Sequence, residues 1–494
     1  MIFTSPTWPL LLGVSTFGLL LLVATVITRG QRPRTGLHKA TWLALMAVVL
    51  AYVDGGAAFA GFLVATLAFN YSAAHAIARA FVREAPGGTT GAATARTWLL
   101  VALAGNAGAL IAMRIVPVFA YAPRMAALGA GSPLVGSKTL LPVGLSLLTF
   151  HAASFLLDVY ERRVAGQKSV GQAGVYLVLL PQFIAGPTGY RGVAGQLSRR
   201  AVGMSDFSYG VRRLAIGVGK RVLIASPCAV AAADIFAKPP GQMAAAAAWL
   251  GIACFTVQVY FTFSGYGDMA IGLGRLFGFK LEENFRWPYA AGSVREFWRR
   301  WHIGLVTWFR DDVRLPRRLG VDAGIWSEAL VILLCALWYG TTWSCLLWGI
   351  YHALFVALED AGVVHVERMP RVFRHAYVLL VIVVGWVWLR ADSLSDAVAI
   401  LTAMAGQNGS ARHVALPLSP TLWTALAAGA VGAAPMAPAI RRWSVAIDAA
   451  TTSMLMMFFA TVVFIWRWAA LVVTSIGAWW RQITRGGPRP GAFY

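Results

Sequence analysis

The chain has 494 residues, of which 58% are hydrophobic and only 13% are charged. A soluble domain carries about 25% charged residues, so this composition excludes an ordinary soluble enzyme. The formal net charge of +22 does not indicate a nucleic-acid partner, because the basic residues stand in short segments between apolar runs rather than on a soluble basic module. We therefore expect residues 1–494 to form a single polytopic domain in membrane lipid.

Apolar windows recur from one end of the chain to the other. A spanning helix needs roughly 20 mostly apolar residues, because lipid cannot satisfy exposed backbone groups. The windows are Pro9–Thr28, Thr41–Asn70, Thr97–Ala120, Lys138–Val159, Tyr176–Gly186, Leu214–Ala233, Ala244–Phe263, Ile325–Val356, Ala376–Leu389, Ser419–Pro435 and Thr451–Ile476. They predict an all-α fold with about ten to twelve apolar helices, the shorter windows being re-entrant or buried in the bundle.

The basic residues predict how the chain is oriented. Arg29, Arg32 and Arg34 follow the first apolar window, which is too long for a signal-peptide core and has no basic segment before it. The first window is therefore expected to be a transmembrane helix with its N-terminus outside. The short basic segments between later windows match the positive-inside pattern of cytoplasmic loops. Residues 481–494 form a basic, Pro- and Gly-rich tail that we expect to be frayed.

The cysteines do not form a recognisable framework. All four, Cys228, Cys254, Cys335 and Cys345, stand in apolar stretches, without a CxxC pair or a Cys/His cluster. Neither a disulfide scaffold nor a zinc site is indicated, so we expect buried small side chains and no metal.

Residues 282–320 interrupt the apolar pattern with many Arg and Trp residues. Read as a helix from Ser293 at roughly 100° per residue, the segment has two distinct faces. The apolar stripe holds Phe297, Trp301, Leu305 and Trp308. The other face holds Arg295, Arg299 and His302. Trp and Arg together are typical of an interfacial helix, and ionisable groups within a membrane domain usually mark a functional path, so chemistry is predicted here.

Two histidines and one aspartate are the first chemical candidates. His302 has an imidazole that takes a proton from an alcohol near neutral pH; its alternative role is structural. His352, in an apolar stretch, is either functional or a helix-packing hydrogen-bond partner. Asp268 lies in a glycine-rich run that permits close helix approach and is expected to pair with Arg275 or another arginine. The Pro- and Gly-broken stretch Pro181–Tyr190 is a predicted re-entrant segment.

Several motifs, in order, resemble the membrane-bound O-acyltransferase family. The strongest is EENFRWPY followed by REFWRRWHIGLVTWFRD. The others are LPVGLSLLTFHAASFLLDVYERR, PQFIAGPTGYR, RRLAIGVGKRVLIA, FTFSGYGDMAIGLGRLFGF and GWVWLRADSLSDAV. They are most similar to a bacterial branch that includes the membrane subunit of alginate O-acetyltransferases and the D-alanyl transfer protein of teichoic acid synthesis. The resemblance covers residues 141–399.

The chain departs from this family at one central position. The family's most invariant residue is a histidine in a Leu-Trp-His-Gly stretch, and here the stretch reads LWYG, with Tyr339 in that place. The family's other central histidine matches His302. A phenol with a reference pKa of about 10 is a poor base at neutral pH, although it can donate a hydrogen bond. Either His302 is the base while Tyr339 orients a group or stabilises charge, or the usual transfer has been lost.

The resemblance implies acyl transfer from a cytoplasmic thioester to a hydroxyl group that reaches the site through a central tunnel. His302 is then the expected base, Tyr339 a hydrogen-bond donor and His352 a further catalytic candidate. The predicted substrate-binding residues are Arg295, Arg299, Arg310, Asp311, Asn284 and Trp338. For the three arginines the reason is charge, because guanidinium groups bind phosphates bidentately; their alternative role is headgroup contact.

By the same resemblance, the donor is acetyl-coenzyme A or another acyl thioester, with no bound cofactor. The acceptor is an exopolysaccharide or cell-envelope glycan, a periplasmic acyltransferase is an expected partner, and the location is the bacterial cytoplasmic (inner) membrane. The alternative is an inactive family member that acts as a membrane scaffold in polysaccharide export, for which Tyr339 is the one positive observation. A secondary transporter fits the helix number, but the sequence has no internal repeat or inverted symmetry.

Overall fold

The computed structural model describes eleven stretches of the chain, all of them helices and their connections. They are residues 57–82, 90–128, 145–164, 170–177, 179, 186–197, 204–238, 240–314, 324–340, 342–408 and 419–435. No strand occurs within these stretches, which confirms the all-α prediction. The chain clusters into two units, Met1–Ala437 and Pro438–Tyr494, and every described residue belongs to the first. The predicted helices at 9–28 and 451–476 and the tail lie outside the described residues.

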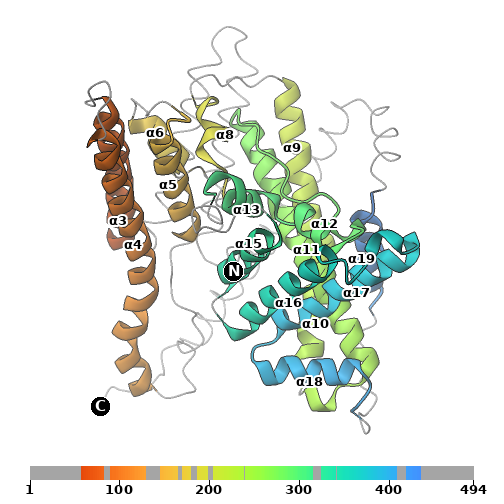
Figure 1. Cartoon of the computed structure of the whole chain (residues 1–494). Coiled ribbons are helices and arrows are strands. Elements are labelled where there is room, and N and C mark those ends of the chain that lie inside the picture. The colour runs from red at the N-terminus through yellow and green to blue at the C-terminus, as the bar shows by residue number, and fades with distance from the viewer. Residues whose placement is uncertain are drawn as a thin grey trace, which may run out of the picture. The chain divides into compact units, whose positions relative to one another are not determined.

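The first helices form one packed group (Figure 1). α3 (Ala57–Val82) and α4 (Thr90–Leu128) run side by side, and α5 (Leu145–Tyr160) packs against both. α6 (Val170–Leu177) and the short α8 (Tyr190–Ala194) contact α5 in turn. Their buried apolar side chains form one core together with Leu276, Phe277 and Phe279 at the end of α11.

The second group is built on one long helix. α9 (Met204–Gly219), the π-helical turn η2 (Lys220–Ala225) and α10 (Ser226–Phe236) follow one another, and α11 (Ala245–Leu276) packs along all three. The 3₁₀ turn η3 (Pro240–Gln242) leads into α11. The window predicted at 244–263 is therefore one helix that continues well beyond its predicted end.

Glycines permit the close approach of α9 and α11. A Cβ atom built on Gly217 would lie 2.5 Å from the Gly265 carbonyl oxygen. One built on Gly272 would lie 2.6 Å from the Gly210 carbonyl oxygen. Small residues let helix backbones meet in lipid, as the glycine-rich run around Asp268 predicted.

We expect Gly217→Ala to lower the free energy of unfolding by about 1–3 kcal/mol, because its methyl group would overlap the facing backbone. Thermal unfolding of the detergent-solubilised protein measures this. Gly219→Ala is the matched control, since a Cβ atom there meets nothing within 4 Å and alanine favours a helix by about 1 kcal/mol. Equal unfolding midpoints for the two variants would contradict close packing at Gly217.

The centre of the chain forms short helices and then two longer ones. The 3₁₀ turn η4 (Pro288–Ala290) precedes α12 (Val294–Arg300) and α13 (Ile303–Thr307), and the π-helical η5 (Trp308–Asp312) follows them. α15 (Ile325–Tyr339) contacts α13 and η5. In Figure 1 α13 and α15 lie between the group of α3 to α5 and the group of α9 to α11.

The last described helices pack around α15 and α11. α16 (Trp343–Asp360) pairs with α15, and α17 (Arg371–Arg390) packs on α16 after the short turn η6 (Val366–Arg368). α18 (Leu394–Met404) contacts α11 and α17, and α19 (Pro420–Ala433) contacts α10 and α11. The apolar side chains of the central and late helices share one large core.

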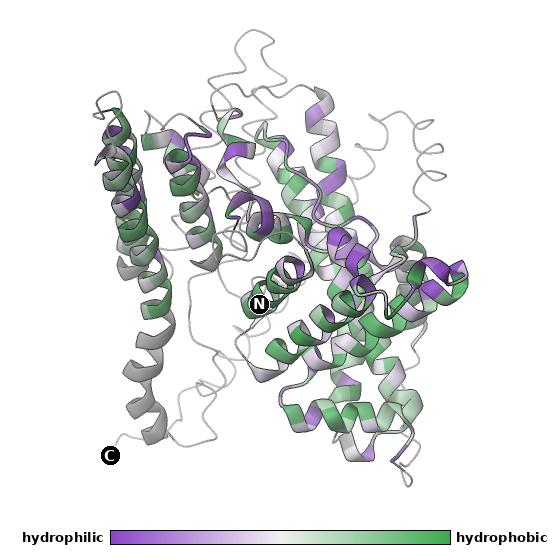
Figure 2. Cartoon of the chain, in the orientation of Figure 1, coloured by the Kyte–Doolittle hydropathy of each residue, from purple (hydrophilic) through white to green (hydrophobic). Residues whose placement is uncertain are grey.

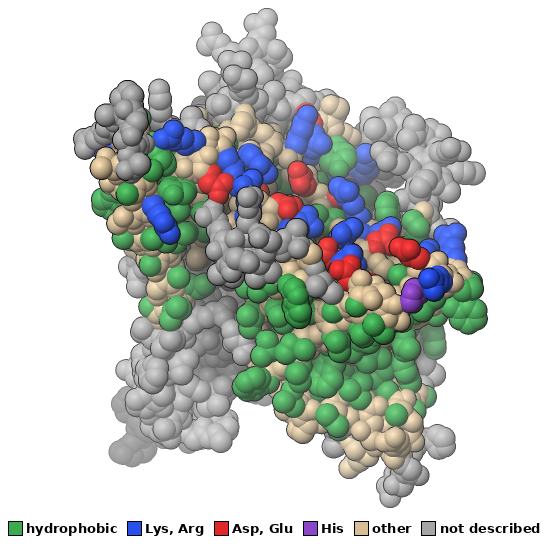
Figure 3. Space-filling view, viewed as in Figure 1, with side chains coloured by type: hydrophobic (Ala, Val, Ile, Leu, Met, Phe, Trp, Pro, Cys, Tyr) green, Lys and Arg blue, Asp and Glu red, His purple; other side chains and the backbone are tan. Residues whose placement is uncertain are grey.

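The hydropathy of these helices is that of a multi-pass membrane protein. Five are long and apolar enough to span: Gly61–Val82, Thr90–Ala112, Ser208–Phe236, Ala245–Leu276 and Arg371–Arg390. Most of the longer helices are green in Figure 2, and its purple stretches lie mainly on α9, α12, α13 and their loops. Charged side chains gather in one band above a largely apolar surface in Figure 3. The total of about ten to twelve helices includes windows beyond the described residues and stays a prediction.

Two further predicted windows have different bounds in the structure, and one described helix had no predicted window. The window at 325–356 is two helices, because α15 ends at Tyr339 and α16 begins at Trp343. The window at 41–70 does not end at Asn70, since α3 continues to Val82. The apolar helix Leu394–Met404 was not among the predicted windows.

Candidate active site

The helix predicted to run from Ser293 is interrupted at His302, so the expectation of one continuous helix is wrong. α12 ends at Arg300, His302 has a left-handed backbone conformation with φ 46°, and α13 begins at Ile303. A non-glycine residue in this conformation is uncommon and often marks a functional site. His302 is also 3% exposed while the Arg299 side chain is 58% exposed, so the two do not share a solvent-facing stripe.

The preceding loop causes this interruption. The Arg286 N–H donates to the Arg300 carbonyl (3.0 Å), and the Ile303 N–H donates to the Asn284 carbonyl (2.9 Å). The Asn284 side-chain Oδ1 accepts from the Gly304 N–H (2.8 Å). These bonds take backbone groups that a continuous helix would pair internally. Asn284 thus holds the start of α13, and its predicted contact with substrate stays a prediction.

The apolar stripe of this segment packs into the protein core. Its four members are almost fully buried: Phe297, Trp301, Leu305 and Trp308. The burial of all four side chains follows from the bend, because the turn at His302 brings both short helices onto the core.

Aromatic rings enclose the His302 imidazole. Trp338 stacks on it at 5.5 Å between ring centroids, and Phe285, Phe263 and Tyr339 lie at 5.6, 6.1 and 6.1 Å. His302 Nδ1 is buried and has no hydrogen-bond partner among the described residues. The structure therefore brings together His302, Trp338 and Tyr339, three of the predicted site residues.

A glycine lies against the Cε1 and Nε2 edge of His302. A Cβ atom on Gly186 would lie 3.2 Å from His302 Cε1 and 3.3 Å from Nε2, and Gly186 has φ 113°, which favours glycine. Burial lowers the pKa of His302 to about 4. The imidazole is consequently neutral at pH 7, because burial disfavours its protonated form.

Tyr339 is the last residue of α15 and its phenol is held by an indole. Trp301 Nε1 donates to the Tyr339 hydroxyl oxygen at 3.3 Å. The ring packs edge-on against Phe263 (5.6 Å) and Trp348 (5.3 Å). No acceptor for the phenolic proton lies in the part of the chain that the structure describes. A phenol can donate one hydrogen bond in addition to the one that its oxygen accepts, here from Trp301.

His352 lies one layer away, in α16. It is fully buried, and its ring contacts Phe297 (6.3 Å), Trp298 (5.5 Å) and Trp348 (5.4 Å). Trp348 also contacts Tyr339, which in turn contacts His302. The structure thus places the third catalytic candidate in the same aromatic cluster, and its catalytic role stays a prediction.

Two predicted phosphate anchors take part in an ion cluster. Arg295 pairs with Glu328 (2.6 Å) and with Asp360, and Arg299 pairs with Glu328 (3.1 Å). Glu359 accepts from the Val294 and Arg295 backbone N–H groups (2.8 and 3.1 Å). These contacts fasten the start of α12 to α15 and α16. A donor phosphate at Arg295 or Arg299 would have to compete with carboxylates.

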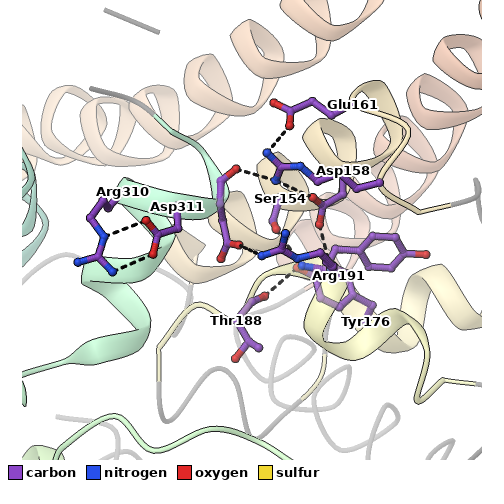
Figure 4. A network of polar contacts seen from close by, with 11 residues as sticks. Ser154, Asp158, Glu161, Tyr176, Thr188, Arg191, Arg310 and Asp311 are labelled. Atoms are coloured by element: carbon purple, nitrogen blue, oxygen red, sulfur yellow. Dashed lines mark hydrogen bonds and ion pairs between the residues drawn. The ribbon is translucent and has the colours of Figure 1, made fainter. Parts of the chain in front are cut away.

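The remaining predicted pair lies on η5. Arg310 Nε and Nη2 donate to the two Asp311 carboxylate oxygens, both at 2.8 Å (Figure 4). Both side chains are partly exposed, at 40% and 46%. This pair belongs to the charged surface, and its part in binding substrate stays a prediction.

Asp268 forms the predicted ion pair with an arginine, and this arginine is not Arg275. Its carboxylate contacts Arg213 (2.5 Å) and Lys220 (2.7 Å), while Arg275 pairs with Asp206 (3.0 Å). The buried carboxylate is therefore compensated by two cations and joins α11 to α9 and η2.

Metal ligands do not cluster in the described part of the chain, where no group of three His, Cys, Asp or Glu residues is placed to hold an ion. The four cysteines are buried and free. The described site consists of aromatic rings and a histidine.

Sequence reasoning missed three features of this site. They are the Trp301 donor to Tyr339, the approach of Gly186 to His302, and the network of Asp158, Arg191 and Asp312 (Figure 4). Asp158 offered a signal, since a carboxylate at the end of an apolar helix is expensive without partners. The predicted re-entrant segment at 181–190 is described only from Gly186 onward.

Known proteins resemble this chain over the region that holds these residues. A family model described as MBOAT, membrane-bound O-acyltransferase family, matches residues 175–391. A probable alginate O-acetylase of Pseudomonas syringae pv. tomato is 33% identical over 375 residues, 73% of this chain and 69% of the relative. A peptidoglycan O-acetyltransferase of Helicobacter pylori is 28% identical, over 55% of this chain and 58% of the relative. A teichoic acid D-alanyltransferase of Streptococcus thermophilus is 25% identical, over 46% and 59%.

Proposed function

Because this chain belongs to the membrane-bound O-acyltransferase family, we propose that it moves an acetyl or other short acyl group from a cytoplasmic thioester to a hydroxyl of an exopolysaccharide or cell-envelope glycan. The names of its relatives pair alginate and peptidoglycan with O-acetyl transfer and teichoic acid with D-alanyl transfer, which supports this class of acceptor. Acetyl-coenzyme A is the proposed donor.

One observation carries the proposal: a buried, neutral imidazole lies beside a phenol whose proton has no acceptor in the described chain. His302 takes the proton of the acceptor hydroxyl as its oxygen attacks the thioester carbonyl. The Tyr339 O–H and the Trp338 indole N–H, which has no partner among the described residues, stabilise the tetrahedral oxyanion. When the carbon–sulfur bond breaks, His302 returns its proton to the thiolate, which leaves an ester and a thiol.

The charged band supports an orientation for the reaction. Basic residues favour the cytoplasmic face, so the band in Figure 3 is proposed to face the cytoplasm of a bacterial inner membrane. The partly exposed Arg299 and Arg310 lie on charged elements and are the arginines best able to exchange a carboxylate for a donor phosphate. The acceptor would reach the site by a tunnel from the far side, with a periplasmic acyltransferase as partner.

The donor assignment makes a kinetic prediction. We expect Arg299→Ala and Arg310→Ala each to raise the KM for acetyl-coenzyme A about tenfold with little change in kcat, because a lost contact to a phosphate weakens binding of donor and transition state alike. Transfer of radiolabelled acetyl groups in membranes measures both constants. Arg212→Ala, which removes a cation beside Tyr209 on α9, is the matched control. Unchanged KM in both site variants would remove these arginines from the donor site.

Tyr339 also favours a second candidate function, a membrane scaffold for polysaccharide export. The phenol cannot serve as a base at neutral pH, so a site that depended on the histidine usual at this position would be inactive. Membranes that support glycan export equally with wild type and His302→Ala, and transfer no acyl group with either, would favour the scaffold.

A further inference from the structure

A polar network outside the aromatic site joins α5, α8 and η5 (Figure 4). The Asp158 carboxylate, 3% exposed, accepts from Arg163 Nη1 (3.1 Å) and from the Arg191 backbone N–H (2.9 Å). Arg163 Nη1 also donates to the Asp312 carbonyl oxygen (3.1 Å), and Arg191 Nη2 lies 3.6 Å from Asp312 Oδ1. Two arginines thus connect a carboxylate of α5 with the last residue of η5.

The segment Gly186–Arg191, called the strap below, is held from α5 and α6 as well. The Tyr176 hydroxyl donates to the Thr188 carbonyl (3.0 Å), and the Tyr190 N–H donates to Ser154 Oγ (2.9 Å). Three of its backbone polar groups, counting the Arg191 N–H, are therefore bound to α5 and α6, although only its last two residues are helical.

The strap lies against the start of α13, at His302, and against the end of η5, at Asp312. A Cβ atom on Gly189 would lie 2.6 Å from Asp312 Oδ2, so the Asp312 carboxylate packs directly on the strap. Three residues earlier, Gly186 covers the Cε1 and Nε2 edge of His302 at 3.2 and 3.3 Å by the same measure. Asp312 and His302 are thus linked through one short stretch of backbone.

We propose that Asp312, acting with Arg191, is a positioning residue that keeps the strap seated over the Nε2 edge of His302. The functional meaning of this position rests on the proposed role of His302 as base. Loss of the Asp312 charge releases the Arg191 side chain and loosens the strap at Gly189, while Asp158, Ser154 and Tyr176 keep it attached. His302 then gains exposure without loss of the fold.

The charge of Asp312 depends on pH. It faces Asp158 of α5, Arg163 after α5, Arg191 of α8 and Asp311 of η5, and burial with the Asp158 charge raises the pKa of Asp312 to about 6. As the pH falls through that value, Asp312 gains a proton and its attraction to Arg191 weakens. While it stays buried, His302 is neutral down to about pH 4.

The test is the rate at which diethylpyrocarbonate, which modifies neutral imidazoles, labels His302 in the full-length protein in detergent, measured by peptide mass spectrometry. Wild type should react slowly at about pH 7.5 and several-fold faster at about pH 5.5, whereas an ordinary histidine slows as it gains a proton. Asp312→Asn should react about tenfold faster than wild type at the higher pH and lose the pH dependence. Arg191→Ala should behave alike, and Arg191→Lys should stay slow.

Two further variants separate positioning from general damage. Gly189→Ala pushes the strap by volume alone, and should speed labelling of His302 with all charges intact. Asp206→Asn on α9 breaks a comparable half-buried pair with Arg275 of α11, and it should leave the labelling rate of His302 unchanged. His352, buried in α16, is the internal reference and should stay unlabelled.

Wild-type rates and pH dependence in both Asp312→Asn and Gly189→Ala would overturn the proposal. Labelling of His352 together with His302 would also overturn it, since the network would then brace the whole fold. This readout needs no acyl transfer, so a wild type that transfers nothing in the kinetic assay would contradict the proposed function and leave the positioning result standing.

Discussion

His302→Ala is expected to reduce acyl transfer by about 10²–10⁴-fold, the usual contribution of a general base. The reason is the position of the imidazole, which is buried, neutral at pH 7 and enclosed by Trp338 and Tyr339. Among the described residues, His302 is the one titratable side chain whose ring packs against the Tyr339 ring. Initial rates with labelled acetyl-coenzyme A in membranes measure the effect.

His365→Ala is the matched control for this variant, because His365 is exposed at the start of η6. It should retain wild-type rates. Thermal unfolding in detergent establishes that the His302 variant is folded, since removal of a buried ring creates a cavity. A folded His302→Ala protein with a rate within a factor of about two of wild type would exclude this histidine as the base.

Tyr339→Phe is expected to lower kcat by about 10²–10³-fold with the KM for the donor nearly unchanged, as for loss of one oxyanion donor. The substitution keeps the ring contacts with Phe263 and Trp348 and removes only the hydroxyl that Trp301 holds. Trp301→Phe should have a smaller effect of the same kind, because the phenol remains but is no longer oriented.

The control for Tyr339→Phe is Tyr209→Phe, a phenol on α9 beside Arg212 and Arg275. Its rate should match wild type. If Tyr339→Phe instead raised the KM and left kcat unchanged, the hydroxyl would bind the ground state and not the oxyanion.

The all-α membrane fold was predictable because long apolar windows have few alternatives in lipid. The neighbourhood of His302 and Tyr339 was predictable only from motif resemblance, since the 36 intervening positions carry no periodic signal that joins them. Periodicity did identify the buried stripe that includes Phe297 and Trp301.

The bend at His302 was not predictable from the helical pattern. The bonds that make it come from Asn284 and Arg286, in a loop that precedes the segment, and a pattern of side chains contains no information on which backbone groups a loop will take. The continuous-helix prediction therefore placed His302 on the same face as Arg299, and the structure corrects it.

Charge alone was also insufficient to predict which group each arginine binds. An arginine in a sequence suits a phosphate or a carboxylate equally, and only the fold brings Glu328 and Asp360 to Arg295. The contacts that hold the strap were unpredictable for the same reason. Asp158, Arg191 and Asp312 are far apart in the chain and meet only when α5, α8 and η5 pack.

The most direct test compares transfer of labelled acetyl groups from acetyl-coenzyme A to extracellular glycan by wild type, His302→Ala and Tyr339→His in membranes with the native glycan machinery. A working site with His302 as base and Tyr339 as donor predicts transfer by wild type and almost none by His302→Ala. No transfer by wild type, with activity only in Tyr339→His, would contradict it and identify a protein that has given up the family reaction.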